Sequence, residues 1–206
     1  MEKVLFNLSR RKVNIDNLNA LEVFAKIGAW HTLDYASRVC SLDAWEIDLK
    51  CEEFLRSNLP NAHVKITDSF EEIKKTDKKF SLIVVDNSMA IYGGKNKYCE
   101  HFDLFPHVFR IMQDECILIL NIIPKIEKQN KHQFPYLFNL EQLRRRKKFY
   151  SSDSPDNLTY EEMSNIYSKY AYENGFNLEW YFIQKRNLIV TYLVLKLKKK
   201  EGTILN

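Results

Sequence analysis

Two long apolar runs restrict the fold of this chain more than any other feature. F-S-L-I-V-V-D (80–86) ends in an acid, and C-I-L-I-L-N-I-I (116–123) is followed by Pro124. Such runs, rich in β-branched residues, are typical of strands that are buried on both faces of a parallel sheet. They are also too short to cross a membrane as helices. The chain is therefore expected to form a sheet with helices packed on both sides.

The segments around these two runs alternate between strand and helix character. Further strands are predicted at 19–25, 42–48 and 63–68, and helices at about 30–39, at 49–59, from Glu71 and at 101–112, where Pro106 is irregular. Strands and helices that alternate at short intervals predict a doubly wound α/β sheet whose strands are mostly parallel.

The last quarter of the chain has a different pattern. A helix is predicted at 160–176, where Asn174 and Gly175 supply the stop signal. L-E-W-Y-F-I-Q and I-V-T-Y-L-V-L-K-L follow, separated by K-R-N-L, and they predict an antiparallel hairpin. The expected fold is thus a seven-stranded, mostly parallel sheet that ends in an antiparallel hairpin.

Composition and charge narrow the class of protein. The chain has 206 residues, of which 45% are hydrophobic, and this suits a single domain. The four cysteines are scattered without a C-x-x-C pair, so neither a disulfide framework nor a metal site is predicted. The first residues lack the apolar core of a signal peptide, and we expect a cytoplasmic protein. Basic runs at 144–148 and 196–200 are either solvated faces or phosphate contacts.

The turn after the first predicted strand carries little glycine. L-E-V-F-A-K-I-G (21–28) contains Gly28 alone, so the G-x-G-x-x-G loop of dinucleotide sites is absent. A G-x-x-x-x-G-K-[ST] phosphate loop is absent as well. A pyrophosphate needs close approach of the backbone, whereas a sulfonium cofactor does not. The single glycine therefore argues against a cofactor that contains a pyrophosphate. It argues less against a cofactor that has none.

The order of these elements resembles the class I S-adenosylmethionine-dependent methyltransferase fold over most of the chain. That family has an acid-x-Gly-x-Gly-x-Gly loop after its first strand. Here Glu22 takes the acid position, Phe24 the first glycine, Lys26 the second and Gly28 the third. Lys26 departs from the family pattern, and its side chain either points to solvent or fills the pocket.

Three further strand ends agree with the resemblance. In W-E-I-D, Glu46 matches the acid that accepts the ribose hydroxyls, and Asp48 is a weaker candidate. In T-D-S-F, Asp68 matches the residue that reads the adenine amino group. V-V-D-N places Asp86 toward the methionine part and the transferred methyl group. The resemblance implies these cofactor-binding residues: Glu22, Phe24, Ala25, Gly28, His31, Thr32, Glu46, Ile47, Asp68, Ser69, Phe70, Asp86 and Asn87.

Each of these acids also has a simpler interpretation, because acids frequently cap the helix that follows them. Asp68 in D-S-F-E-E fits a capping box in particular. What favours a binding site is their joint placement, since ligands of open α/β sheets bind at the carboxyl ends of the strands.

The residues that follow the predicted strand at 80–86 include candidates for the methyl-transfer chemistry. Methyl transfer to a hydroxyl needs a general base, and Asp86 and His101 are the catalytic candidates. The substrate candidates are Tyr92, Tyr98, His101 and Tyr136. Tyr136 lies in 124–158, an irregular segment of the single domain that we expect to form a lid over the substrate.

The sequence leaves several functions open. The leading one is an S-adenosylmethionine-dependent methyltransferase that acts on a hydroxyl of a small molecule, such as a saccharide or a nucleotide-linked metabolite. D-N-S-M (86–89) lacks the prolines of the [DNS]-P-P-[YFW] motif of nucleic-acid amino-methyltransferases. An RNA or DNA methyltransferase that uses 144–148 is the alternative, together with an inactive Rossmann-like binding domain or an aminopropyltransferase. No membrane partner is expected, and the oligomeric state stays open.

Overall fold

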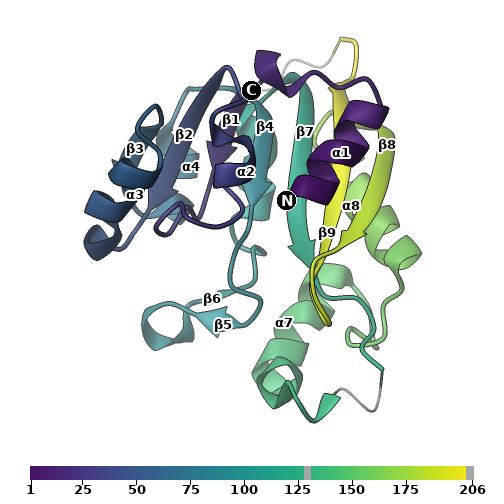
Figure 1. The fold of residues 1–206 in the computed structure, drawn as a ribbon. Coiled ribbons are helices and arrows are strands. Elements are labelled where there is room, and N and C mark those ends of the chain that lie inside the picture. The colour runs from purple at the N-terminus through teal and green to yellow at the C-terminus, as the bar shows by residue number, and fades with distance from the viewer. Residues whose placement is uncertain (128–130, 203–206) are drawn as a thin grey trace.

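A seven-stranded sheet with the order β3-β2-β1-β4-β7-β9-β8 is the centre of the molecule (Figure 1). It is seen in a computed structural model that describes residues 1–127 and 131–202. Its strands are β1 (Asn19–Glu22), β2 (Ser41–Glu46), β3 (His63–Ile66), β4 (Phe80–Val85), β7 (Met112–Ile122), β8 (Phe176–Lys185) and β9 (Thr191–Lys199). Neighbouring strands from β3 to β7 pair in parallel, while β9 is antiparallel to both β7 and β8. The predicted doubly wound sheet with a terminal hairpin is confirmed.

Helices cover both faces of this sheet (Figure 1). One face carries α1 (Glu2–Arg10), α2 (Leu33–Ala36) and α3 (Glu52–Asn58), and the other carries α4 (Ser69–Lys75), α5 (Phe105–Val108) and α8 (Tyr160–Glu173). Along β4, Leu82 and Val84 pack into the first layer, whereas Ile83 and Val85 pack into the second. Successive side chains of a strand point to opposite faces, so a strand between two helical layers must be apolar throughout. This explains the run at 80–86.

Several predicted boundaries are wrong, and the structure explains two of them. The first strand ends at Glu22 rather than at residue 25, because the chain leaves the sheet there to form the turn that holds Gly28. The helix predicted at 101–112 is only α5, which continues as η4 (Phe109–Ile111), and Met112 already belongs to β7. Pro106 lies in the first turn of α5, where its missing N–H costs no hydrogen bond.

A smaller layer lies beyond the carboxyl ends of β4 and β7 (Figure 1). It contains a hairpin of β5 (Ile91–Tyr92) and β6 (Tyr98–Cys99), together with α7 (Leu140–Tyr150). Short 3-10 turns complete the described chain: η1 (Ile15–Asn17), η2 (Leu49–Cys51), η3 (Gly94–Asn96) and η5 (Pro135–Phe138). Among the helices of residues 1–127 and 131–202, none has the length and apolar character that crossing a membrane requires.

Candidate functional site

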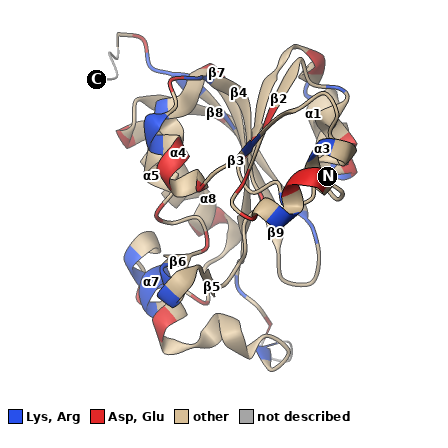
Figure 2. Ribbon diagram, turned by 90° about the vertical axis from the view of Figure 1, so that its left-hand side faces the viewer, with Lys and Arg blue, Asp and Glu red and all other residues tan. Residues whose placement is uncertain are grey.

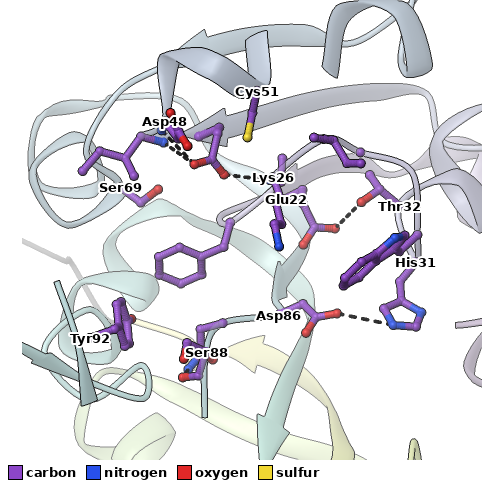
Figure 3. Close-up of a pocket in the computed structure, with 18 of the residues that line it drawn as sticks. Glu22, Lys26, His31, Thr32, Asp48, Cys51, Ser69, Asp86, Ser88 and Tyr92 are labelled. Atoms are coloured by element: carbon purple, nitrogen blue, oxygen red, sulfur yellow. Dashed lines mark hydrogen bonds and ion pairs between the residues drawn. The ribbon is translucent and has the colours of Figure 1, made fainter. Parts of the chain in front are cut away.

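The segments that follow β1, β2, β3 and β4 surround one cavity of about 560 Å³ (Figure 3). It lies where the chain, having built β1, β2 and β3 outward, returns to add β4 on the other side of β1. Open α/β sheets bind their ligands at such a switch in strand order. The cavity is lined by all the residues that the resemblance implied for the cofactor: Glu22, Phe24, Ala25, Gly28, His31, Thr32, Glu46, Ile47, Asp68, Ser69, Phe70, Asp86 and Asn87. Their roles in binding stay predictions.

The carboxylate of Glu46 is held in one orientation by backbone N–H groups. Its Oε1 accepts hydrogen bonds from the N–H of Ile47 (2.9 Å) and of Asp48 (2.8 Å), and its Oε2 accepts one from the N–H of Lys26 (2.7 Å). A carboxylate has about four lone-pair sites, so further acceptor capacity remains. Oε1 already accepts two of these hydrogen bonds, so Glu46 presents one further fixed acceptor position, on Oε2.

The turn after β1 contains a single glycine, but its backbone has positive φ angles at two positions, as a glycine-rich loop does. Gly28 has a φ of +68°, and a Cβ there would lie 2.8 Å from methyl groups of Leu55 and Leu59. Lys26 also has a positive φ, of 50°, although it carries a side chain. That side chain is exposed, and its Nζ lies 5.1 Å from the centre of the Trp30 ring. Lys26 thus forms part of the rim, and the cavity exists in its presence.

Aromatic side chains build one wall of the cavity. Phe70 stacks on Tyr98 with ring centres 3.6 Å apart and planes 3° apart, and Phe24 lies 5.9 Å from Phe70. Asp68 caps α4 by accepting a hydrogen bond from the N–H of Phe70 at 2.9 Å, as the capping interpretation proposed. Its second oxygen lies 3.5 Å from the Tyr98 hydroxyl. Asp68 therefore combines a capping role with a place on the cavity wall.

Asp86 lies at the other end of the cavity, away from Asp48 and Ser69 (Figure 3). It forms an ion pair with Arg186 and accepts hydrogen bonds from Asn121 and, at 3.2 Å, from the hydroxyl of Tyr192. His31 Nε2 is 3.9 Å from Asp86 Oδ2. Burial, followed by the Arg186 charge, lowers the pKa of His31, so this imidazole is neutral at pH 7.

Glu22 lies between these two ends and has a different environment (Figure 3). Its carboxyl group is buried and accepts hydrogen bonds from the hydroxyls of Tyr35 and Thr32. Burial and the nearby Asp86 raise the pKa of Glu22 to about 8. Glu22 is therefore mainly protonated at pH 7.

Two predicted site residues do not reach the cavity. His101 is fully buried, its Nε2 is 2.7 Å from the Tyr167 hydroxyl, and burial lowers its pKa to about 3. An imidazole buried behind the cavity wall has no access to a substrate, so the prediction of His101 as a base and substrate contact is wrong. Tyr136 lies in η5, is half exposed and does not line the cavity, so its assignment as a substrate residue stays a prediction.

The described residues of the segment 124–158 do not close over the cavity either. Leu137 packs with Ile126 against Ile189 and Val190 of the β8–β9 turn, and Met89 contacts the same cluster. None of the described residues of 124–158 lines the cavity, and residues 128–130 lie outside the described chain. The lid is therefore not seen.

Asp48, the weaker candidate beside Glu46, also lines the cavity, and some lining residues were not predicted: Lys26, Ile27, Ala29, Trp30, Cys51, Ser88, Gly93 and Arg186. Most are sequence neighbours of predicted ones. Arg186 is different, because it reaches Asp86 across 100 residues of sequence.

The cavity suits an adenosyl cofactor with a sulfonium group. Its volume lies within the range of about 300–1,000 Å³ that is typical of small-molecule sites. The oriented Glu46 carboxylate suits a ribose hydroxyl, the aromatic wall suits a planar ring, and the ion pair of Asp86 and Arg186 lies at the other end. These groups lie in one continuous cavity in the order in which such a molecule presents its parts.

No protein-family model matches the chain, and no curated protein matches it in sequence. Solved structures with the same fold do match. M. jannaschii TYW2 in complex with AdoMet aligns with a TM-score of 0.54 and 14% identity, over 97% of this chain and 77% of that chain. A Pyrococcus horikoshii protein described as a candidate RNA methyltransferase aligns with a TM-score of 0.58 and 13% identity, over 98% and 82%. M. jannaschii tRNA m1G37 methyltransferase aligns with a TM-score of 0.54 and 10% identity, over 98% and 48%.

These alignments extend over almost the full length of the chain and include the antiparallel strand β9. The chain therefore has the fold of the class I S-adenosylmethionine-dependent methyltransferases. At 10–15% identity the similarity establishes that fold and leaves the activity to be argued from the site.

Proposed function

We propose that this protein is a methyltransferase that uses S-adenosylmethionine. One observation carries the proposal: the fixed carboxylate of Glu46 and the charged pair of Asp86 and Arg186 lie at opposite ends of a single cavity at the switch point of the sheet. The fold and the AdoMet complex of M. jannaschii TYW2 support it.

The residues of the cavity have distinct roles in this proposal. Glu46 accepts the ribose hydroxyls, and Asp68 with the aromatic wall holds the adenine ring. Asp86, at the inner end, faces the cationic part of the cofactor. When bound, S-adenosylmethionine supplies an already activated methyl carbon. The protein then has to hold the acceptor atom close to that carbon and in line with it.

We further propose that the acceptor is a nitrogen atom of an RNA base. A hydroxyl needs a general base, whereas a nitrogen lone pair depends less on one. His101 is buried behind the cavity wall, and both oxygens of Asp86 are engaged by Arg186, Asn121 and Tyr192. Two of the structures above are described as RNA methyltransferases. The earlier hypothesis of a small-molecule hydroxyl has no such support.

Cations near the cavity also favour an RNA acceptor. The β5–β6 hairpin carries Lys95 and Lys97 on its exposed side, and the Lys and Arg residues of α7 lie beside it (Figure 2). Within the run 144–148, however, Arg146 is buried and Arg145 donates to backbone carbonyls of the hairpin. The run 144–148 is thus partly structural, and Lys97 is the cation beside Tyr98.

Calorimetric titration with S-adenosylhomocysteine tests the cofactor site. We expect one molecule to bind per chain, and Glu46→Ala to weaken binding by about ten-fold or more, because charge-assisted hydrogen bonds to the ribose are lost. Glu53→Ala is the matched control, since Glu53 is an exposed acid on α3 that does not line the cavity. Absence of binding to the intact protein would refute the proposal and leave the inactive binding domain.

Transfer of a labelled methyl group tests the acceptor. The protein is incubated with methyl-labelled S-adenosylmethionine and, separately, with a total RNA fraction, a DNA fraction and a set of nucleotide sugars. We expect label in RNA, and transfer that falls as salt rises, because phosphate contacts release counterions. Label that appears only in the nucleotide sugars would restore the small-molecule hypothesis and refute the RNA acceptor.

A further inference from the structure

Among the described residues, Arg186 is the one Lys or Arg that the second half of the chain contributes to the cavity lining. It lies in the turn between β8 and β9, and backbone hydrogen bonds close that turn. The N–H of Arg186 donates to Val190 O at 2.9 Å, and Asn187 Oδ1 accepts from the N–H of Ile189 (3.0 Å) and of Val190 (2.8 Å). The backbone that carries the guanidinium is therefore fixed in position.

The Arg186 guanidinium has N–H groups that make no hydrogen bond within the described chain. Its five N–H groups make one side-chain hydrogen bond within the described chain, from Nη1 to Asp86. The group also lies 5.5 Å from the centre of the Tyr192 ring, and its side chain is 20% exposed. A guanidinium in a cavity that still has free N–H groups is suited to bind an oxyanion through two parallel hydrogen bonds.

Arg186 lies at the acceptor end of the cavity. Its partner Asp86 follows β4 and precedes Asn87 and Ser88, which also line the cavity. The ribose and adenine positions proposed above depend on Glu46 and Asp68, which follow β2 and β3, and on the aromatic wall beside Asp68. A group bound by Arg186 therefore belongs to what lies beyond the reacting end of the cofactor.

The charge balance at this end favours an anion. The charges of the Asp86–Arg186 ion pair cancel. Glu22 is mainly protonated at pH 7, and His31 is neutral at that pH. A bound S-adenosylmethionine adds a net positive charge from its sulfonium, ammonium and carboxylate groups. An acceptor with a negative group restores neutrality in a space where charges are poorly screened.

The geometry points to Arg186 as the residue that binds a phosphate group of the methyl-accepting nucleotide and so determines acceptor specificity. This inference rests on the proposed function, and it goes beyond it by naming the contact that selects the acceptor. The phosphate is either the 5′ phosphate of a mononucleotide or a backbone phosphate of RNA, and the two share the same recognition chemistry.

Nuclear magnetic resonance on the complex with S-adenosylhomocysteine tests the contact directly. The Nε–H signal of Arg186 is assigned by its loss in Arg186→Lys and followed while inorganic phosphate is added. The same complex is then titrated with nucleoside 5′-monophosphates, with the matching nucleosides and with a short single-stranded oligoribonucleotide. We expect the signal to shift with phosphate, and one monophosphate or the oligoribonucleotide to bind about ten-fold more tightly than the nucleoside.

Variants show whether the effect belongs to Arg186. Arg186→Met should bring the affinity for the phosphate-bearing ligand down to that of the nucleoside, and Arg186→Lys should retain part of it because the charge stays beside Asp86. Lys185→Met is the matched control, since Lys185 is an exposed cation of the same strand end that does not line the cavity. It should change the affinity less than about two-fold, within ordinary context effects of surface charge.

The outcomes separate this inference from the function on which it rests. If the intact protein fails to bind S-adenosylhomocysteine, the proposed function fails. If S-adenosylhomocysteine binds, but Arg186→Met binds the phosphate-bearing ligand as tightly as the intact protein does, the inference alone is wrong. If Arg186→Met instead loses S-adenosylhomocysteine, Arg186 holds the cofactor carboxylate, which also overturns it. Dependence on Arg186 with the oligoribonucleotide but not with the mononucleotides supports it and identifies RNA as the source of the phosphate.

Discussion

Glu22 and Asp86 are two carboxyl groups in one cavity, and their surroundings differ. Glu22 is buried with hydroxyl partners, whereas Asp86 has the cation of Arg186 beside it. Burial disfavours the charged form of an acid, and it raises the pKa of Glu22. The nearby Asp86 opposes a charge on Glu22 as well.

Replacing Glu22 by Gln should change how stability depends on pH. The pKa of Glu22 is about 8 in the folded protein, against an ordinary value of 4.5. Between these values the folded state binds a proton that the unfolded state does not, so the free energy of unfolding falls as pH rises. Glu22→Gln removes this contribution and keeps an oxygen that accepts the Tyr35 hydrogen bond.

Urea unfolding between pH 5 and pH 8 measures the effect. The variant and the intact protein should have similar stability near pH 5, and the variant should be more stable by about 3 kcal/mol at pH 7. Curves that run parallel over this range would show that Glu22 is not held neutral.

Lys26 should be replaceable by Gly with a gain in stability. Its φ of 50° is left-handed, which costs an L residue about 1 kcal/mol or more. Lys26→Ala is the matched control, because it removes the same side chain and its contact with Trp30 but keeps the strain. Thermal unfolding should rank Lys26→Gly above Lys26→Ala by about 1 kcal/mol. An Ala variant as stable as the Gly variant would contradict the assigned backbone conformation.

At the scale of elements, α7 and the β5–β6 hairpin act as one unit beside the site. Arg146 donates to Glu100 at 2.8 Å and to the carbonyls of Ile123 and Pro155, and all three of its contacts are buried. Arg145 donates to the carbonyls of Asn96 (2.8 Å) and Lys97 (2.9 Å). The segment predicted as a lid thus supports, from behind, the hairpin that presents Tyr92 and Tyr98 to the cavity.

Breaking the Arg146–Glu100 pair should loosen this unit. Arg146→Met leaves Glu100 buried without its cation and should lower the free energy of unfolding by about 3 kcal/mol or more. Adding Glu100→Gln should recover part of the loss, and Arg144→Met, at an exposed position of the same helix, should change stability little. Urea unfolding measures these stabilities, and hydrogen exchange at Tyr92 and Tyr98 should rise in the single variant. Unchanged exchange there would show that α7 does not hold the hairpin.

At the scale of the molecule, the sequence predicted what local patterns determine. The apolar runs, their alternation with helices and the terminal hairpin predicted the sheet, and the acids at strand ends predicted the lining of the cavity. Contacts between segments far apart in the sequence could not be predicted from local patterns. Arg186 contacts Asp86 across 100 residues, and no local pattern distinguishes K-R-N-L from an ordinary turn. His101 was misassigned for a related reason, since its burial depends on Tyr167 of α8.

A crystal structure of the protein with S-adenosylhomocysteine tests the central claim most directly. We predict that the ligand occupies the cavity after β1, with its ribose hydroxyls on Glu46, its adenine beside Asp68 and Phe70, and its methionine part toward Asp86. Crystals grown or soaked at saturating ligand that leave this cavity empty, or hold the ligand elsewhere on the molecule, would contradict the account.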